Sequence, residues 1–330
     1  ISDRFSPSRV FACNALIGAG FNLMTVLTSD GGLILLCRLA TGFFLAGLYP
    51  VGMKIAADHF GKDIGKALGW LLGALALGSA SPNLLKYLQL TSGLKGEFVF
   101  LVTSLLSLTG GALVWFCVPD GPFRSPGQKF RLKGLLVCFK DRRFKGAAFG
   151  YFGHMWELYA FWTVVPVIWR NYLGDNAGFG SQQAFLSFAV IAAGSVGCVI
   201  ATALARRSGF NKLAIVVLSA SGICCLVSPW LLNIPSFSVL LIFTVVWGFL
   251  VIADSPLFSS MVAVYAETSV KGSALTMVNC IGFSVTVIAI EVLNRFMAQF
   301  DLSYGLLILA PGPVFGVWAL FRYRSAASGH

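Results

Sequence analysis

The chain has 330 residues, of which 57% are apolar and only 11% are charged, and its mean hydropathy is +0.82. A soluble domain carries roughly 25% charged and about 45–50% apolar residues, so this composition excludes an ordinary soluble protein. It indicates helices that are solvated by lipid. The net charge of +11 would suit nucleic acid only if the basic residues formed one exposed patch.

Ten segments of the sequence are apolar and long enough to cross a bilayer, whose ~30 Å core needs about 20 helical residues. In chain order they cover residues 10–28, 32–56, 64–88, 97–118, 146–169, 182–204, 212–233, 237–262, 270–293 and 303–321. The connections are short except for residues 119–145, which are strongly basic. The sequence therefore predicts an all-α, multi-pass membrane protein.

The basic residues are unevenly distributed between the two sides of this predicted bundle. If residues 1–9 face the cytoplasm, alternation of the spans places 19 of the 24 Lys and Arg residues on the cytoplasmic side. Such a bias follows the positive-inside rule and sets the orientation. It accounts for the net charge without nucleic acid, although the long basic loop is also suited to contact anionic lipid headgroups. We expect a bacterial inner (plasma) membrane location.

Enzyme chemistry has little support in the sequence. The eight Cys residues lie mostly in apolar segments without metal-binding spacing, and the three His residues are far apart. No H-E-x-x-H or G-x-S-x-G arrangement occurs in the sequence. We expect a non-enzyme that needs neither a metal nor a cofactor.

Two pairs of segments indicate an internal duplication. SDRFSPSR (2–9) is similar to ARRSGFNK (205–212), and GFFLAGLYP (42–50) is similar to GFLVIADSP (248–256). Both spacings are close to 205 residues, which is typical of a transporter built from two related bundles. The predicted domains are an N-terminal bundle at 1–118, a basic cytoplasmic loop at 119–145 and a six-helix bundle at 146–330. The first bundle then has four of six helices, and two more are expected upstream.

SDRFSPSR resembles the loop motif Gly-x-x-x-Asp-Arg-x-Gly-Arg-Arg of the major facilitator superfamily of secondary transporters. Asp3 and Arg4 match the acidic–basic pair, Arg9 supplies a following basic residue, and Ser6 replaces the Gly. RLATGFFLAG similarly resembles the family's helix-four motif through Arg38. The resemblance implies a fold of twelve helices in two pseudo-symmetric halves, of which ten helices are present here.

The second copy of the loop, ARRSGFNK, keeps Arg207 and Lys212 but has Arg206 in place of the Asp. In the family this loop holds the two halves in the outward-open state. The resemblance therefore implies a cytoplasmic gating role for a set of charged residues, with clustered loop charges that do not gate as the alternative. The set is Asp3, Arg4, Arg9, Arg207 and Lys212. GALALGSASP, in the predicted fifth helix, lacks the Gly-Gly of the family's antiporters, which disfavours antiport.

Ionisable residues inside apolar spans are costly, at about 2.5–3.5 kcal/mol each on insertion scales, and so indicate function. His154 and Glu157 lie on one face of the span at 146–169, and a desolvated carboxyl can bind and release a proton near neutral pH. Asp254 lies just before the helix-bending Pro256, and Arg38 needs a carboxylate, a helix C-terminus or a bound anion. The predicted substrate and proton site comprises Arg38, Tyr151, His154, Glu157, Phe161 and Asp254. For His154 and Glu157, the alternative is a polar pair that only bonds a neighbouring helix.

These observations predict a monomeric secondary active transporter that works by alternating access. The expected substrate is a small polar solute, and an organic anion moved by proton symport is favoured because Arg38 and His154 can donate to it. Ionised Glu157 and Asp254 would instead favour a cation and proton-coupled drug antiport (efflux). Passive facilitation is the third possibility. Proton-driven uptake with and without an uncoupler separates these hypotheses.

Overall fold

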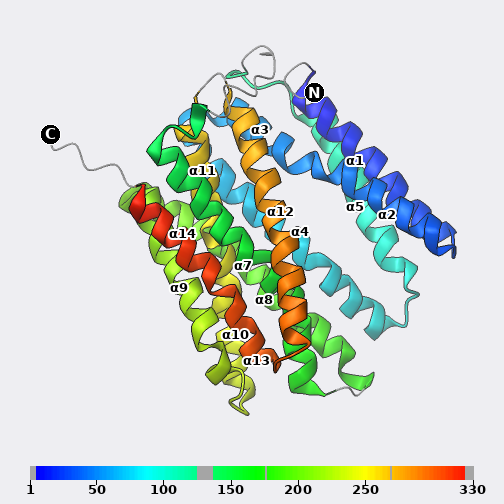
Figure 1. Cartoon of the computed structure of the whole chain (residues 1–330). Helices are drawn as coiled ribbons and strands as arrows, with labels where there is room; N and C mark the ends of the chain where they lie inside the picture. The colour runs from blue at the N-terminus through cyan, green and yellow to red at the C-terminus, as the bar shows by residue number, and fades with distance from the viewer. Residues whose placement is uncertain (1–4, 125–136, 175–176, 268–269, 324–330) are drawn as a thin grey trace. The chain divides into compact units, whose positions relative to one another are not determined.

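The structure is a computed structural model that describes residues 5–124, 137–174, 177–267 and 270–323. These residues form helices and short connections, with no strand among them (Figure 1). The helices of the first part of the chain are α1 (Pro7–Met24), α2 (Gly31–Ala46), α3 (Leu48–Phe60), α4 (Ile64–Ser92) and α5 (Glu97–Cys117). Those of the second part are α7 (Arg142–Leu173), α8 (Gly180–Ser208), α9 (Phe210–Leu231), α10 (Phe237–Ala253), α11 (Ser255–Tyr265), α12 (Lys271–Met297), α13 (Leu302–Gly305) and α14 (Pro311–Arg322).

Nine of the ten predicted spans coincide with helical segments that are long and apolar enough to cross a membrane, within the described part of the chain. The remaining one, α7, is a continuous helix of 32 residues over the predicted range but is not among those nine. Its sequence is less apolar because it carries His154 and Glu157 as well as several Gly and Tyr residues. Most of α7 is buried by other helices instead of being exposed to lipid.

The chain divides into two compact units. The first comprises residues 1–67 and 84–129, and the second comprises residues 68–83 and 130–330. In the first unit α1 packs along α5 and α2 and also contacts α3. The middle of α4 groups with the second unit, whereas both of its ends group with the first. The domain boundaries at 118/119 and 145/146 stay predictions.

The second unit is organised around α7, which contacts α8, α10, α11, α12 and α14. In Figure 1 the red α14 follows the green α7 along much of its length, and α10 packs against α8. Small residues allow close approach: a Cβ on Gly69 of α4 would lie 2.5 Å from the Thr202 hydroxyl of α8. A Cβ on Gly73 would lie 3.0 Å from the Ser195 carbonyl oxygen. Gly69 and Gly73 of α4 therefore form a close-packing surface against α8.

Two of the predicted spans are interrupted helices. The segment at 31–60 is divided at Gly47 between α2 and α3, and the segment at 237–265 is divided at Asp254 between α10 and α11. A Pro follows each interruption, at Pro50 and Pro256, and a Pro cannot donate the backbone hydrogen bond that a continuous helix needs. The interruptions fall 207 positions apart, close to the spacing of the sequence repeat.

Candidate functional site

The centre of the second unit contains three buried ionisable side chains. His154 and Glu157 of α7 are each 1% exposed, and Asp254 at the α10–α11 interruption is 0% exposed. Burial of charge costs several kcal/mol per ion unless a partner compensates it. The partners of these three residues therefore determine what the site can do.

His154 pairs with Asp254: its Nδ1 atom lies 2.8 Å from Asp254 Oδ1. Neither carboxyl oxygen of Asp254 accepts an aligned hydrogen bond within the described residues, and His154 Nε2 has no partner there. His154 Nδ1 and Asp254 Oδ1 are thus close enough to form an ion pair, but they are not aligned for a hydrogen bond. When the imidazole is protonated the pair is neutral overall, and the imidazolium then compensates the cost of burying the Asp254 carboxylate.

The interruption of the helix explains how Asp254 reaches this position. Pro256 lies in the first turn of α11, and the Asp254 carbonyl oxygen accepts hydrogen bonds from the backbone N–H groups of Leu257 and Phe258 at 2.9 and 3.0 Å. The backbone turn places the carboxyl group beside α7 at the point where α10 ends. An apolar span that is interrupted at an ionisable residue is a recurrent way to form an ion or substrate site in transporters.

Glu157 has a different environment. Its Oε1 atom accepts hydrogen bonds from the Ser221 hydroxyl, from Trp247 Nε1 at 2.7 Å and from the Cys225 thiol at 3.3 Å. Ser221 and Cys225 lie one turn apart on α9, and Trp247 lies on α10. One carboxyl oxygen therefore connects three helices of the unit.

Aromatic side chains complete the site. Phe161 stacks on the Trp247 indole with ring centroids 4.4 Å apart, which fixes the orientation of the indole N–H toward Glu157. Tyr151 and Phe258 flank the His154 ring at centroid distances of 5.8 and 5.9 Å. The Tyr151 hydroxyl donates to Asn279 Oδ1 of α12 at 2.7 Å. Tyr151 and Phe161 thus lie next to the residues with which the sequence grouped them.

Four residues of this site were missed by the sequence analysis: Ser221, Cys225, Trp247 and Asn279. Ser and Cys are common in apolar spans, so the i, i+4 spacing on α9 was not distinctive. The one available signal was that a buried indole N–H needs an acceptor. Sequence alone does not say which acceptor it finds.

Arg38 belongs to the first unit, whereas the five other predicted site residues belong to the second. Its side chain is exposed and donates from Nη1 to Asn22 Oδ1 at 2.9 Å. Asn22 in turn donates to the Ser104 hydroxyl of α5 at 2.9 Å, and the guanidinium lies 5.5 Å from the centre of the Phe100 ring. Arg38 therefore has polar and cation–π partners within its own unit.

The predicted gating residues are only partly covered by the structure. Asp3 and Arg4 lie outside the described residues. Arg9 is exposed on the first turn of α1, Arg207 is exposed near the end of α8, and Lys212 is exposed at the start of α9. Arg9 belongs to the first unit and the other two to the second.

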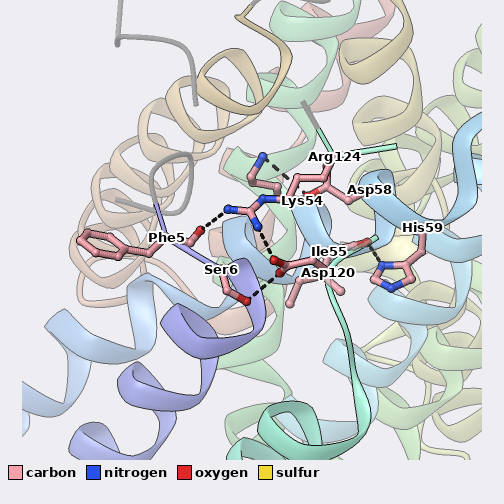
Figure 2. A network of polar contacts seen from close by, with 8 residues as sticks. All are labelled: Phe5, Ser6, Lys54, Ile55, Asp58, His59, Asp120 and Arg124. Carbon is pink, nitrogen blue, oxygen red and sulfur yellow. Dashed lines mark hydrogen bonds and ion pairs between the residues drawn. The ribbon is translucent and has the colours of Figure 1, made fainter. Parts of the chain in front are cut away.

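A polar network near the N-terminus of α1 was not predicted. Arg124 pairs with Asp120 and donates to the Phe5 carbonyl oxygen at 3.1 Å, while the Ser6 hydroxyl donates to Asp120 Oδ1 at 2.7 Å (Figure 2). Ser6 stands at the motif position that carries Gly in the resembling family. The Ser6 hydroxyl bonds to Asp120, a contact that a Gly at this position could not make.

The same network includes the end of α3. Lys54 lies 3.7 Å from Asp58, and the Asp58 carbonyl oxygen accepts a hydrogen bond from the Phe123 N–H at 2.9 Å (Figure 2 shows the Lys54–Asp58 pair). Gly121 lies against the Asp58 backbone, where a Cβ would collide with the carbonyl group. The segment after α5 is thus joined to both α1 and α3.

Within the described residues, no group of His, Cys, Asp and Glu could hold a metal ion.

Comparisons with known proteins support the family resemblance that the sequence motifs indicated. A family model described as Major Facilitator Superfamily matches residues 1–290. The crystal structure of the E. coli fucose:proton symporter FucP is similar, with a TM-score of 0.72 and 13% sequence identity, over 97% of this chain and 84% of that chain. At this identity the similarity shows the fold alone. A comparison with the sequences of curated proteins found no match.

Proposed function

Because the chain belongs to the Major Facilitator Superfamily, a family of secondary transporters, we propose that it moves a small organic anion together with a proton by alternating access. The observation that carries this proposal is the buried His154–Asp254 pair. Family membership supports transport itself. The substrate class and the coupling ion are inferred from the chemistry of this pair.

The argument rests on charge balance in a buried site. With one shared proton the pair is neutral, and a second proton gives it a net positive charge in an environment that excludes water. An organic anion bound beside the pair neutralises that charge, and the proton in turn removes the cost of burying the anion. Each ligand thus increases the affinity for the other, which is the thermodynamic condition for symport.

The same pair can support one other function. Loss of the shared proton gives a net negative charge, which would attract an organic cation and produce proton/cation antiport. The two carboxyl oxygens of Asp254, which accept no hydrogen bond within the described residues, favour this second candidate. The two functions differ in the direction in which an inward proton gradient moves the substrate.

The test uses the purified protein in liposomes with an inward proton gradient. The probes are radiolabelled lactate, succinate, L-fucose and tetraethylammonium, with and without a protonophore. L-Fucose is included because the structurally similar E. coli protein is a fucose:proton symporter. Protonophore-sensitive accumulation of an anion supports the proposal.

Three other outcomes would contradict it. Proton-driven expulsion of tetraethylammonium would favour antiport, and accumulation of L-fucose without either anion would favour a neutral substrate. If a probe only equilibrates across the liposome membrane, and the protonophore does not change its uptake, the protein would be a passive facilitator. Empty liposomes and protein-containing liposomes without a gradient are the controls.

A further inference from the structure

The start of α7 and the end of α14 lie together at one end of the second unit. The Arg142 guanidinium donates from Nη2 to the backbone carbonyl oxygen of Arg322 at 3.0 Å. The Lys145 ammonium lies 5.8 Å from the centre of the Tyr323 ring, which is within the range of a cation–π contact. Two cationic side chains of α7 thus meet the end of α14, where Arg322 supplies a third.

The three cations are carried by two helices in fixed contact. Arg142 and Lys145 lie on the first turn of α7, and Arg322 is the last residue of α14. Further along, the two helices approach closely, because a Cβ on Gly316 of α14 would lie 3.1 Å from the Gly150 carbonyl oxygen of α7. The spacing between the cations is therefore set by helix packing and not by a loop.

Acidic side chains do not neutralise this cluster. Within the described residues, none of Arg142, Lys145 and Arg322 forms an ion pair with an acid. The adjacent acid, Asp141, caps α7, and its Oδ1 atom accepts hydrogen bonds from two backbone N–H groups of the first turn. Three cations against one acid leave a net positive charge that a bound anion can neutralise.

Aromatic side chains follow the cations along the same two helices. Trp318 and Phe315 precede Arg322 by four and seven residues, so all three lie on one face of α14. The Trp318 and Phe315 side chains are 52% and 42% exposed. Phe149 of α7 joins this face, with its ring centre 6.1 Å from that of Phe315 and 5.8 Å from that of Tyr323. At about 1.5 Å per residue, Trp318 lies ~6 Å and Phe315 ~10 Å further into the span than Arg322.

This order of side chains matches the chemistry of an anionic phospholipid. Arg and Lys side chains bind a phosphate group by charge-assisted hydrogen bonds, an indole is suited to the membrane interface, and exposed Phe side chains pack against acyl chains. A soluble phosphate would contact the cations alone. The distribution of Lys and Arg in the sequence predicts that this end faces the cytoplasm, where basic sites between helices bind anionic headgroups.

We propose that the ends of α7 and α14 bind one anionic phospholipid, with Arg142, Lys145 and Arg322 around its phosphate and with Trp318 and Phe315 against its acyl chains. This site is separate from the substrate and proton site proposed above and does not depend on it. A lipid bound here joins α14 to the helix that carries the candidate functional site.

The test is native mass spectrometry of the purified protein in detergent. The probes are phosphatidylglycerol and phosphatidylcholine with identical acyl chains, which differ in headgroup charge. Arg142→Gln/Lys145→Gln should weaken the tightest phosphatidylglycerol binding about 25-fold, since each cation near the headgroup contributes about fivefold. Phosphatidylcholine binding should not change.

A matched control removes the same charge from exposed positions outside the site. Arg143→Gln/Arg207→Gln should keep wild-type binding of phosphatidylglycerol. Arg143 lies on the opposite side of α7 from Lys145, because two residues turn the helix by about 200°, and Arg207 lies near the end of α8. Melting temperatures without added lipid show whether both double variants are folded.

The aromatic part of the site has a separate readout that leaves the cations unchanged. Brominated acyl chains quench the fluorescence of a Trp that they contact. In liposomes, brominated phosphatidylglycerol should quench the wild-type protein more than brominated phosphatidylcholine does. This excess should be lost in Trp318→Phe and kept in Trp230→Phe, at an exposed Trp of α9.

Three results would overturn the inference. Equal weakening in the two double variants would show that the basic residues attract anionic lipid only through net charge. Displacement of phosphatidylglycerol by a comparable concentration of sn-glycerol 3-phosphate would assign the cations to a soluble phosphate. Excess quenching that persists in Trp318→Phe would place the lipid elsewhere on the protein.

Discussion

Gly153 of α7 and Gly312 of α14 lie backbone against backbone: a Cβ atom on Gly312 would lie 2.5 Å from the Gly153 carbonyl oxygen. A Cβ on Gly153 would likewise collide with the Gly312 carbonyl group and with Gly316. Only glycine at these positions allows the two helices to approach this closely. The contact fixes α14 along the helix that carries His154 and Glu157.

Substitution of Gly153 by Ala should therefore destabilise the protein. Overpacking of a close helix contact costs about 1–3 kcal/mol, and both obstructing neighbours are backbone atoms that cannot rotate away. The apparent melting temperature in detergent should fall clearly. Gly178→Ala is the matched control, because a Cβ there meets no atom within 4 Å; equal melting temperatures for the two variants would contradict the prediction.

Loss of one donor to Glu157 should cost more stability than loss of an ordinary serine hydroxyl. Ser221→Ala removes one hydrogen bond from a fully buried carboxyl oxygen and leaves that acceptor with one donor fewer, which costs about 1–3 kcal/mol. Ser284→Ala removes only an exposed hydrogen bond to the Cys280 carbonyl oxygen one turn earlier on α12. Thermal unfolding of both variants checks this, and a Ser221→Ala protein as stable as Ser284→Ala would show that Glu157 does not depend on this donor.

The network at the start of α1 should depend more on shape than on charge. Arg124 and Asp120 are 25% and 39% exposed, so Arg124→Gln should change stability by about 1 kcal/mol or less. Gly121→Ala should be more damaging, because its Cβ would displace the Asp58 backbone from its hydrogen bond to Phe123. Hydrogen exchange of residues 54–60 measures this directly. Faster exchange in Arg124→Gln than in Gly121→Ala would reverse the order that we expect.

Transport measurements should test the role of the His154–Asp254 pair. Asp254→Asn should exchange substrate across liposomes at equal concentrations but should not accumulate it in a proton gradient, because its proton site is lost. The probe is whichever anion the wild-type protein accumulates, and accumulation by Asp254→Asn at the wild-type level would exclude this residue as the proton site.

Much of the fold was predictable because a membrane span has a simple signature. Apolar length located the helices to within several residues, and the repeat placed corresponding Pro residues near both helix interruptions, at Gly47 and Asp254. The prediction that α7 resembles the other spans was incomplete. Its low hydropathy reflects burial among helices, and such burial depends on partners that are distant in sequence.

The membership of the site was easier to predict than its pairing. Helical spacing grouped His154 with Glu157, and a place inside an apolar span just before Pro256 selected Asp254. Residues three positions apart are still offset around the helix axis, which lets His154 reach Asp254 while Glu157 faces Ser221 and Trp247. These contacts join residues that are 64 to 100 positions apart, and local sequence patterns carry no information on such distances.

The polar character of α7 also affects how the protein is made. Membrane insertion occurs while the chain is being synthesised, and an isolated helix with two ionisable groups near its centre enters lipid at a cost of several kcal/mol. The groups that compensate this cost, on α9, α10 and the α10–α11 interruption, emerge from the ribosome after α7. Stable partitioning of α7 must therefore await synthesis of its later partners, and a nascent chain arrested before Trp247 should leave this one helix poorly inserted.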